Sequence, residues 1–184
     1  MKVGYQMKRK RIALSPENVR FRLAETNDIE QIMQLVKLAI DTMKKNGIDQ
    51  WDELYPCEED FCDDIVNHSL YMGCVDNKLV SIFTINNQFD EAYFAEGIKW
   101  KFSAKGASCI HRLCVHPEFQ GHQIGKKTLL YAEQIMKNSG FESVRLDVFS
   151  ENPVAIRLYE NNGYVRKGSA FWRKGEFFLM EKAL

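Results

Sequence analysis

The stretch that decides the fold is I-H-R-L-C-V-H-P-E-F-Q-G-H-Q-I-G-K-K-T, residues 110 to 128. Its first part favours a strand, because Leu113 and Val115 are strand formers and Pro117 has no N–H to extend a ladder. A glycine-rich turn at 120–125 follows, and apolar residues at helical spacing come after it. The free N–H groups and the dipole at the start of that helix predict a binding site for an anion.

The glycine spacing excludes two common nucleotide-binding loops. A Walker loop has four residues between its glycines, followed by Lys and by Ser or Thr. Gly121 and Gly125 have three residues between them, and Lys127 stands where the hydroxyl residue would be. The dinucleotide pattern G-x-G-x-x-G is absent from the sequence as well.

The segment instead resembles the acyl-CoA pyrophosphate loop Q/R-x-x-G-x-G/A of the GNAT superfamily of N-acetyltransferases, which follows a V-x-P sequence. Val115-His116-Pro117 and the run from Gln120 to Gly125 fit that pattern. One position departs from it, because Gln123 stands where the family has its middle glycine. A non-glycine residue at a left-handed backbone angle costs roughly 1 kcal/mol. Either the turn differs here or the chain tolerates the strain.

A second segment, residues 152–164, resembles the family pattern N-x-x-A-x-x-x-Y-x-x-x-G-[FY]. Asn152 suits a helix N-cap, Pro153 suits the first helical position, and Gly163 suits a left-handed C-terminal stop. The two motifs occur in the family's order and spacing. The resemblance is specific over 110–164 and extends in architecture over 20–184.

The resemblance implies an α/β (α+β) fold with a mixed, mostly antiparallel sheet flanked by helices on both faces. In that fold the strand ending at Val115 and the strand at 143–149 run parallel and splay apart. We expect the order β-α-α-β-β-β-α-β-α-β-β, with Asn27 capping the first helix and Glu30 completing a capping box. We also expect one domain over 20–184 after a basic extension over 1–19.

Composition narrows the class of protein. The 184 residues carry a formal net charge of zero, so no nucleic-acid partner is expected. No apolar run approaches the length that a membrane helix needs, so no membrane partner is expected either. Five cysteines without a C-x-x-C pair favour free thiols in the cytoplasm. The basic residues before Arg11 favour a flexible tail over a nucleic-acid or membrane arm.

The activity implied by the resemblance is transfer of an acetyl group from acetyl-CoA to an amine. Carried onto this sequence, it places acetyl-CoA, a co-substrate, against Leu113, Cys114, Val115, Gln120, Gly121, His122, Gln123, Ile124, Gly125, Lys126, Asn152 and Tyr159. A backbone N–H of the central strand would bind the thioester oxygen. Tyr159 would donate a proton to the departing thiolate, or else would only pack beneath the pantetheine arm.

An amine acceptor must first lose a proton. A lysine-like amine titrates about three pKa units above neutrality, so only about one part in a thousand is reactive at pH 7. His111 is the candidate base, because imidazole titrates near neutrality and relatives carry histidine near this position. Glu118 and a water chain are the alternatives, and a histidine without a catalytic task is another.

Cys109, His111, Cys114 and His116 also resemble a metal cluster. On a regular strand odd and even residues face opposite ways, so the four side chains would converge only if a bulge intervened. No metal is therefore expected. Cys114 is not expected to carry an acyl group either, because the family transfers directly.

The acceptor is expected to be a small-molecule amine, with a polyamine or an aminoglycoside-like cation as examples. Trp51 and Tyr55 are the candidate substrate-binding residues, although Trp51 could equally plug the core. Seven acids without a base favour a solvated helix face over a surface that attracts amines: Asp52, Glu53, Glu58, Glu59, Asp60, Asp63 and Asp64.

Three further points stay open in the sequence. The acceptor could be a protein lysine or N-terminus instead of a small molecule. The chain could also be a CoA-binding module without turnover, for which Gln123 is the main support. The aromatic-rich segment 86–107 could wall the substrate site or take part in a homodimer, which the family often forms through its closing strands.

Overall fold

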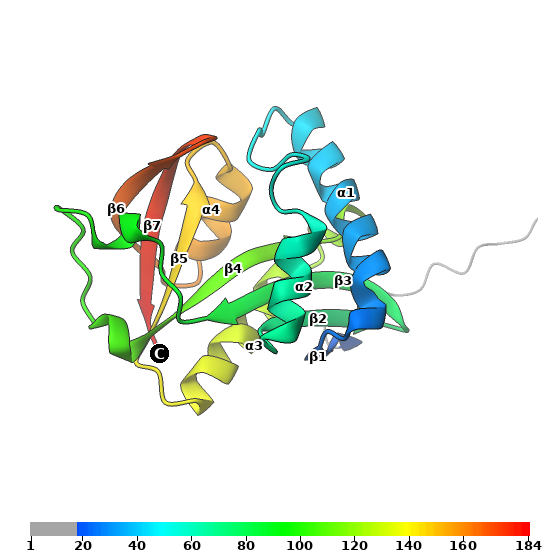
Figure 1. Cartoon of the computed structure of the whole chain (residues 1–184), viewed down its shortest axis with the longest axis horizontal. Coiled ribbons are helices and arrows are strands. Elements are labelled where there is room, and N and C mark those ends of the chain that lie inside the picture. Colours follow the sequence, from blue (N-terminus) through cyan, green and yellow to red (C-terminus); the bar gives the residue numbers. More distant parts are fainter. Residues whose placement is uncertain (1–17) are drawn as a thin grey trace, which may run out of the picture.

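The computed structural model describes residues 18–184, which form one seven-stranded sheet covered by helices (Figure 1). Most of the predicted basic extension, residues 1–17, lies outside the described residues. Val19 at its end is buried beside Val80 and Phe119. Within residues 18–184, no helix is long and apolar enough to cross a membrane.

The elements follow the predicted order. The strands are β1 (Arg20–Leu23), β2 (Leu70–Val75), β3 (Lys78–Asn86), β4 (Ala107–Val115), β5 (Ser143–Phe149), β6 (Val165–Trp172) and β7 (Gly175–Ala183). The helices are α1 (Ile29–Lys45), α2 (Glu58–Val66), α3 (Ile124–Asn138) and α4 (Pro153–Glu160). Short 3₁₀ turns lie at Thr26–Asp28, Glu91–Phe94, Ala104–Gly106 and Pro117–Phe119.

The sheet order is β1-β2-β3-β4-β5-β7-β6, and β4 with β5 is its parallel pair. Those two strands pair only over Ala107–Cys109 and Ser143–Arg145, whereas β5 pairs with β7 along its whole length. Figure 1 shows the consequence, since green β4 and orange β5 start together near the C-terminus and then diverge. The predicted splayed, mostly antiparallel sheet is confirmed.

Helices cover both faces of the sheet, as predicted. Ile32 and Val36 of α1 and Phe61 of α2 pack in one core with Leu70 and Ile82 of the sheet. On the opposite face, α3 and α4 bury Leu129 and Tyr159 against the strands. The apolar positions of each helix recur at a spacing of three and four residues, which is why each helix has one buried side.

The start of α1 differs from the prediction that Asn27 caps it. The helix begins at Ile29 after a 3₁₀ turn, and Glu25 and Asp28 form the capping box. The Asp28 carboxylate accepts from the Glu25 N–H at 2.8 Å and binds Arg22 of β1 at 2.6 Å. The Asn27 prediction was wrong because this charged contact from β1 makes Asp28 the better acceptor.

A buried ion pair fastens the long segment 87–106 to the sheet. Arg145 and Glu181 face each other with a 3.5 Å Nε–Oε1 distance, and both side chains are almost fully buried. The Lys101 N–H donates to Glu181 at 2.7 Å, and Arg145 donates to the Phe102 carbonyl at 2.6 Å. The Arg145 guanidinium also lies 4.2 Å from the centre of the Trp100 ring. The Arg145–Glu181 pair therefore holds the segment 87–106 against the sheet.

We predict that Glu181→Gln lowers the free energy of unfolding by about 3 kcal/mol, because it leaves the Arg145 cation buried without its counter-charge. Chemical denaturation measures the change. Glu176→Gln is the matched control, since it also breaks a Glu–Arg pair from β7, with Arg166, but on the half-exposed surface. That control should cost less than about 1 kcal/mol. Equal losses in the two variants would contradict the anchoring role.

Candidate functional site

Two cavities meet where β4 and β5 separate. The first, of about 340 Å³, lies between the end of α1, the loop at 120–126 and α4. The second, of about 370 Å³, lies between the loop at 50–55, β4 and the turn from β6 to β7. Five residues line both cavities: Gln50, Trp51, Leu113, Asp147 and Tyr159. A molecule in one cavity would therefore reach a molecule in the other at these side chains.

The predicted pyrophosphate loop lines the first cavity. Its members there are Gln120, Gly121, Gln123, Ile124, Gly125 and Lys126, and Leu113, Cys114, Val115, Asn152 and Tyr159 complete the predicted set. His122 is exposed and lines neither cavity.

The turn takes the form that the family pattern needs, in spite of its unusual residue. Gln123 has φ +61° and ψ 9°, in the left-handed region, and stands immediately before α3. Gly121 has φ +79°, which favours glycine. The strain at Gln123 is therefore tolerated, and the turn is not rearranged to avoid it. Gly125 is in close contact, since an added Cβ would lie 3.4 Å from Leu158 and 3.6 Å from Val115.

Asn152 joins the two motifs to the loop after α1. Its side-chain oxygen accepts from the Ala155 N–H at 3.1 Å, as predicted for an N-cap. Its side-chain nitrogen donates to Gln50 at 2.9 Å, across 102 residues of sequence. Gln50 was not foreseen, because a lone glutamine in a loop has no sequence signal.

Tyr159 lies at the junction of the two cavities and is 7 % exposed. Burial, with a smaller contribution from the charge of Asp147, raises the pKa of its phenol well above the ordinary value. Tyr159 is therefore protonated at neutral pH, which suits a group that donates a proton. Its ring packs edge-on against Tyr164, with 5.7 Å between the ring centres.

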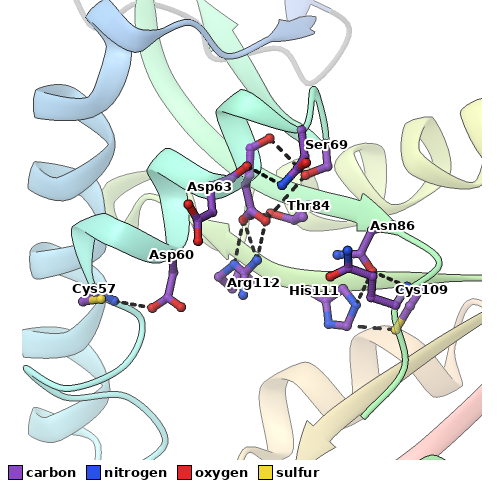
Figure 2. Close-up of polar contacts among 12 residues, drawn as sticks. Cys57, Asp60, Asp63, Ser69, Thr84, Asn86, Cys109, His111 and Arg112 are labelled. Carbon is purple, nitrogen blue, oxygen red and sulfur yellow. Dashed lines mark hydrogen bonds and ion pairs between the residues drawn. The ribbon is translucent and has the colours of Figure 1, made fainter.

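His111 lines the second cavity and has a defined hydrogen-bond partner. Its Nε2 lies 3.0 Å from the Asn86 side-chain oxygen, and its Nδ1 lies 4.0 Å from the Cys109 sulfur (Figure 2). Burial lowers the pKa of His111, while the nearby charge of Asp147 opposes that shift. A neutral imidazole at pH 7 can accept a proton.

Asp147 is the residue that sequence reasoning missed. Its carboxyl lines both cavities and accepts from the Tyr93 hydroxyl at 2.9 Å. Burial raises the pKa of Asp147, and the charge of His111 and the Tyr93 hydrogen bond act in the other direction. A raised carboxyl pKa is typical of a group that exchanges protons. No sequence signal marked it, because its place at the junction depends on where β5 leaves β4.

A bulge in β4 changes which way its side chains point. The register with β3 shifts between Ile82 and Thr84, opposite Arg112, whose φ is +50°. Consecutive residues normally alternate across a sheet, but here His111 and Arg112 both line the second cavity. The left-handed angle at Arg112 costs roughly 1 kcal/mol. The fold therefore keeps a strained residue at the wall of this cavity.

Asp64 of α2 holds Arg112 in that position. The two side chains form a bidentate pair at 2.6 and 2.9 Å, and both are nearly buried. Asp64 also accepts from Thr84 at 2.7 Å, and Figure 2 shows Thr84 and Arg112 meeting at this carboxylate. Arg112 donates to the Tyr55 hydroxyl at 3.2 Å. The interpretation of 52–64 as a solvated acidic face was therefore wrong for Asp64, because a buried arginine needs a counter-charge.

Asp52 is likewise paired. Arg173 donates to both of its oxygens at 2.7 and 2.8 Å, and Lys174 lies 2.8 Å away. These contacts, the Arg173 hydrogen bond first, hold the pKa of Asp52 far below its ordinary value. Lys174 also binds Asp49 at 2.7 Å. The loop at 49–55 is thus clamped to the turn from β6 to β7 by ion pairs.

The two candidate substrate residues differ in exposure. Trp51 is 7 % exposed, lines both cavities and packs in the core beneath α1. Trp51 thus packs in the core and also lines the cavities, so the two interpretations of this ring do not exclude each other. Tyr55 is 41 % exposed at the edge of the second cavity.

The cysteines and histidines of β4 do not form a cluster. Cys109 lies beside His111, whereas Cys114 packs in the core beneath α1. Across residues 18–184, no group of three or more His, Cys, Asp or Glu side chains could hold a metal ion.

Comparison with known proteins identifies the family. The sequence profile of the Acetyltransferase (GNAT) family matches residues 34–164, which is most of the chain. The chain therefore belongs to the GNAT family of acetyltransferases, and the predicted family is confirmed.

Two relatives are N-acetyltransferases. Spermidine N(1)-acetyltransferase of Thermoplasma acidophilum is 38% identical over 85 residues, which is 46% of this chain and only half of that relative. S-(2-succino)cysteine N-acetyltransferase of Bacillus subtilis is 24% identical over 167 residues, covering 89% of this chain and 94% of the relative. The expected class, an N-acetyltransferase, is confirmed at the level of the family.

Solved structures agree on the fold. A GNAT-family acetyltransferase from Streptococcus agalactiae superposes with a TM-score of 0.78 at 26% identity, covering 90% of this chain and 95% of the other. The PaiA N-acetyltransferase from Thermoplasma acidophilum, solved in complex with coenzyme A, has a TM-score of 0.66 at 22% identity, with 90% and 99% covered. The family's acetyl-CoA chemistry agrees with a loop of this shape beside the first cavity.

We predict that Gln123→Gly stabilises the protein by about 1 kcal/mol, because glycine adopts the left-handed angle without a Cβ clash. For a chain of this length that change corresponds to a rise in Tm of about 2–4 °C. Gln120→Gly is the control, since Gln120 has φ −64° and gains nothing from glycine. Coenzyme A affinity should stay the same or improve in Gln123→Gly. A large loss of affinity would mean that the Gln123 side chain contacts the coenzyme.

Proposed function

We propose that this protein transfers an acetyl group directly from acetyl-CoA to a primary amine of a small molecule. The observation that carries the proposal is that Tyr159 and Asp147 line both cavities. The first cavity, with its glycine turn and helix N-terminus, suits the pyrophosphate and pantetheine arm of acetyl-CoA. The second cavity suits the amine. The proton donor and the proton acceptor then lie where the two substrates meet.

The gap between β4 and β5 accounts for the placement of the thioester. Beyond Cys109 the edge of β4 that faces β5 has no strand partner, so its backbone N–H groups are available to a ligand. A donor at that edge, near Leu113 to Val115, stabilises the oxygen on which negative charge develops. Asn152 and the loop at 120–126 hold the rest of the coenzyme against the first cavity.

Proton removal from the amine falls to Asp147 and His111 acting as a pair. Both lie in the second cavity, and each changes the other's pKa through its charge. Because each charge acts on the other group, the pH dependence of proton removal would depend on both residues. Asp147 lines both cavities, whereas His111 lines only the second, so Asp147 would lie nearer to the reacting atoms. Glu118, the other candidate, pairs with Lys78 on the surface.

The departing thiolate takes its proton from Tyr159. Burial raises the pKa of this phenol and makes it a weaker acid, so the transfer depends on the negative charge that develops on the sulfur beside it. Tyr159 belongs to α4, whose N-cap Asn152 lines the same cavity. The same short helix thus contributes both a binding and a catalytic group.

The clamp over the second cavity favours a small molecule over a protein acceptor. Asp52 binds Arg173 and Lys174, and Asp49 binds Lys174, so ion pairs join the loop at 49–55 to a turn that lines this cavity. An extended peptide would need that side of the cavity to be open. Both relatives named above act on small amines, and these amines differ from each other.

Calorimetry with acetyl-CoA, followed by thiol release over a panel of amines, tests the proposed function. Micromolar binding together with release for one class of small amine is the expected result. Binding without release from any small amine would favour a protein acceptor or a CoA-binding module. Absence of binding would remove the proposal altogether.

We predict that Tyr159→Phe lowers kcat by about 10²-fold or more, because the phenol proton is lost while the ring stays in place. The Kd for coenzyme A should change by less than about twofold, because a phenol that acts mainly in the transition state adds little to ground-state binding. Tyr164→Phe is the matched control: this neighbouring tyrosine is equally buried but lines neither cavity. If kcat and coenzyme affinity fall together in Tyr159→Phe, Tyr159 contributes to coenzyme binding by packing and is not the proton donor.

We predict that Asp147→Asn lowers kcat/KM at pH 7 by about 10²-fold, because the amide cannot accept a proton. The plot of kcat/KM against pH should also change. Its acid limb, where activity falls as the pH is lowered, should move in opposite directions in Asp147→Asn and His111→Gln. Asp147→Asn removes the anion that raises the pKa of His111, so the remaining limb moves to lower pH. His111→Gln removes the cation that lowers the pKa of Asp147, so the limb moves to higher pH. Profiles unchanged in both variants would exclude the pair as the base.

A further inference from the structure

The second cavity has an unexpected charge for a site that acts on amines. Three cationic side chains line it, Arg112, Arg173 and Lys174, against two carboxylates, Asp90 and Asp147. Trp51, Tyr55 and Trp172 supply aromatic walls between them. A polyamine would need several anionic positions in this cavity, each open to one of its ammonium groups.

The two carboxylates differ in their surroundings. Asp90 accepts from the Ala92 N–H at 2.9 Å and from the Trp172 indole at 3.3 Å, in both cases through Oδ1, so these contacts hold it at the wall and leave its charge in place. Asp147 lies at the junction with the first cavity, where the proposed function places the reacting amine. A second ammonium group on the acceptor would therefore have Asp90 as its carboxylate, whereas Arg112, Arg173 and Lys174 line the same cavity as cations.

Arg112 is built into the wall as a donor. Adjacent strand residues normally point to opposite faces, yet the left-handed angle at Arg112 brings it into the same cavity as His111. Its guanidinium binds Asp64 of α2, and Figure 2 shows the His111 ring a short way from Arg112 along the same strand. Its Nε and Nη2 bind Asp64, and its Nη1 bonds the Tyr55 hydroxyl at the cavity edge. Nη1 carries two hydrogens, so one remains for a ligand.

Arg173 adds a second donor at the rim. Asp52 takes one hydrogen from each of its two Nη atoms, out of the five N–H donors of a guanidinium. The side chain lines the cavity and is 49 % exposed, so its other donors are accessible to a ligand. Arginine is suited to carboxylates because its planar donors match two oxygens at once.

We infer that the acceptor is an amine that also carries a carboxylate, an amino acid or a derivative of one. Its amine lies at Asp147 and His111, and its carboxylate binds Arg112 with Tyr55, with Arg173 at the rim. This inference rests on the proposed function and replaces the expected polyamine by a molecule with both charges. A side chain of the acceptor would lie against the aromatic walls.

Matched triplets test the inference: phenylalanine, phenylalaninamide and phenethylamine, with the same three forms built on leucine, and spermidine as the polycation. Thiol release gives kcat/KM for each. We expect the acid to exceed its amide and its decarboxylated amine by about 10-fold or more in at least one triplet, as charge-assisted hydrogen bonds imply. The amide has the more acidic ammonium and presents more free amine, so a preference for the acid reports the carboxylate itself.

A double variant identifies the binding group. Asp64→Asn with Arg112→Met removes both partners, so no buried charge is left alone. The ratio of kcat/KM for the acid to kcat/KM for its decarboxylated amine, both measured in this variant, should fall about 10-fold. Arg166→Gln, on β6 outside both cavities, is the control that should keep the preference.

Three outcomes would separate the inference from the function on which it rests. Turnover that favours spermidine or the decarboxylated amine overturns the inference and keeps the acetyltransferase. If coenzyme A binds but no triplet turns over, calorimetry compares the binding of the acids and the amides to the coenzyme complex. The inference is overturned if the acids bind no more tightly than their amides. Loss of coenzyme binding and of all turnover removes the function itself.

Discussion

The separation of β4 from β5 is the constraint on which the site depends. Parallel strands are stabilised by an even ladder of hydrogen bonds, and here the ladder stops after three residue pairs. The backbone groups beyond it need other partners, since unpaired buried N–H groups are costly. In the proposed function acetyl-CoA supplies such partners, so the gap that weakens the sheet would also create the binding edge. The strong pairing of β5 with β7 and of β4 with β3 keeps each half rigid while the gap stays open.

Several ion pairs maintain this arrangement from both sides. Arg145 and Glu181 fix the segment at 87–106 beneath one wall, and Asp64 fixes Arg112 at another. Asp52 and Arg173 join the loop after α1 to the opposite half of the sheet. The first two pairs are almost fully buried, so they hold geometry more than they add net stability. Precise placement of walls is what a transfer between two bound molecules requires.

The sequence predicted what local patterns and motifs determine. Asn152 as N-cap, Gly163 as left-handed stop and the order of elements depend on residues within one or two turns of each other. Asp28 as helix cap depends on Arg22 of β1, and the phase of Arg112 depends on the register with β3. The place of Asp147 depends on where β5 leaves β4. These contacts join distant segments, and no spacing in the sequence records them.

The acidic run at 52–64 shows that the charge of a surface can be judged only once the ion pairs of its acidic residues are known. Seven acids without a base suggested a solvated surface or an attraction for cations, yet Asp52 and Asp64 are the counter-ions of Arg173 and Arg112. Each acid holds an arginine at the second cavity, so the run contributes to that cavity through the cations it positions. Because each arginine has more donors than its acid accepts, some positive character remains toward the ligand. A run of acids in sequence can therefore build a site for an anionic group, through the bases that the fold brings to it.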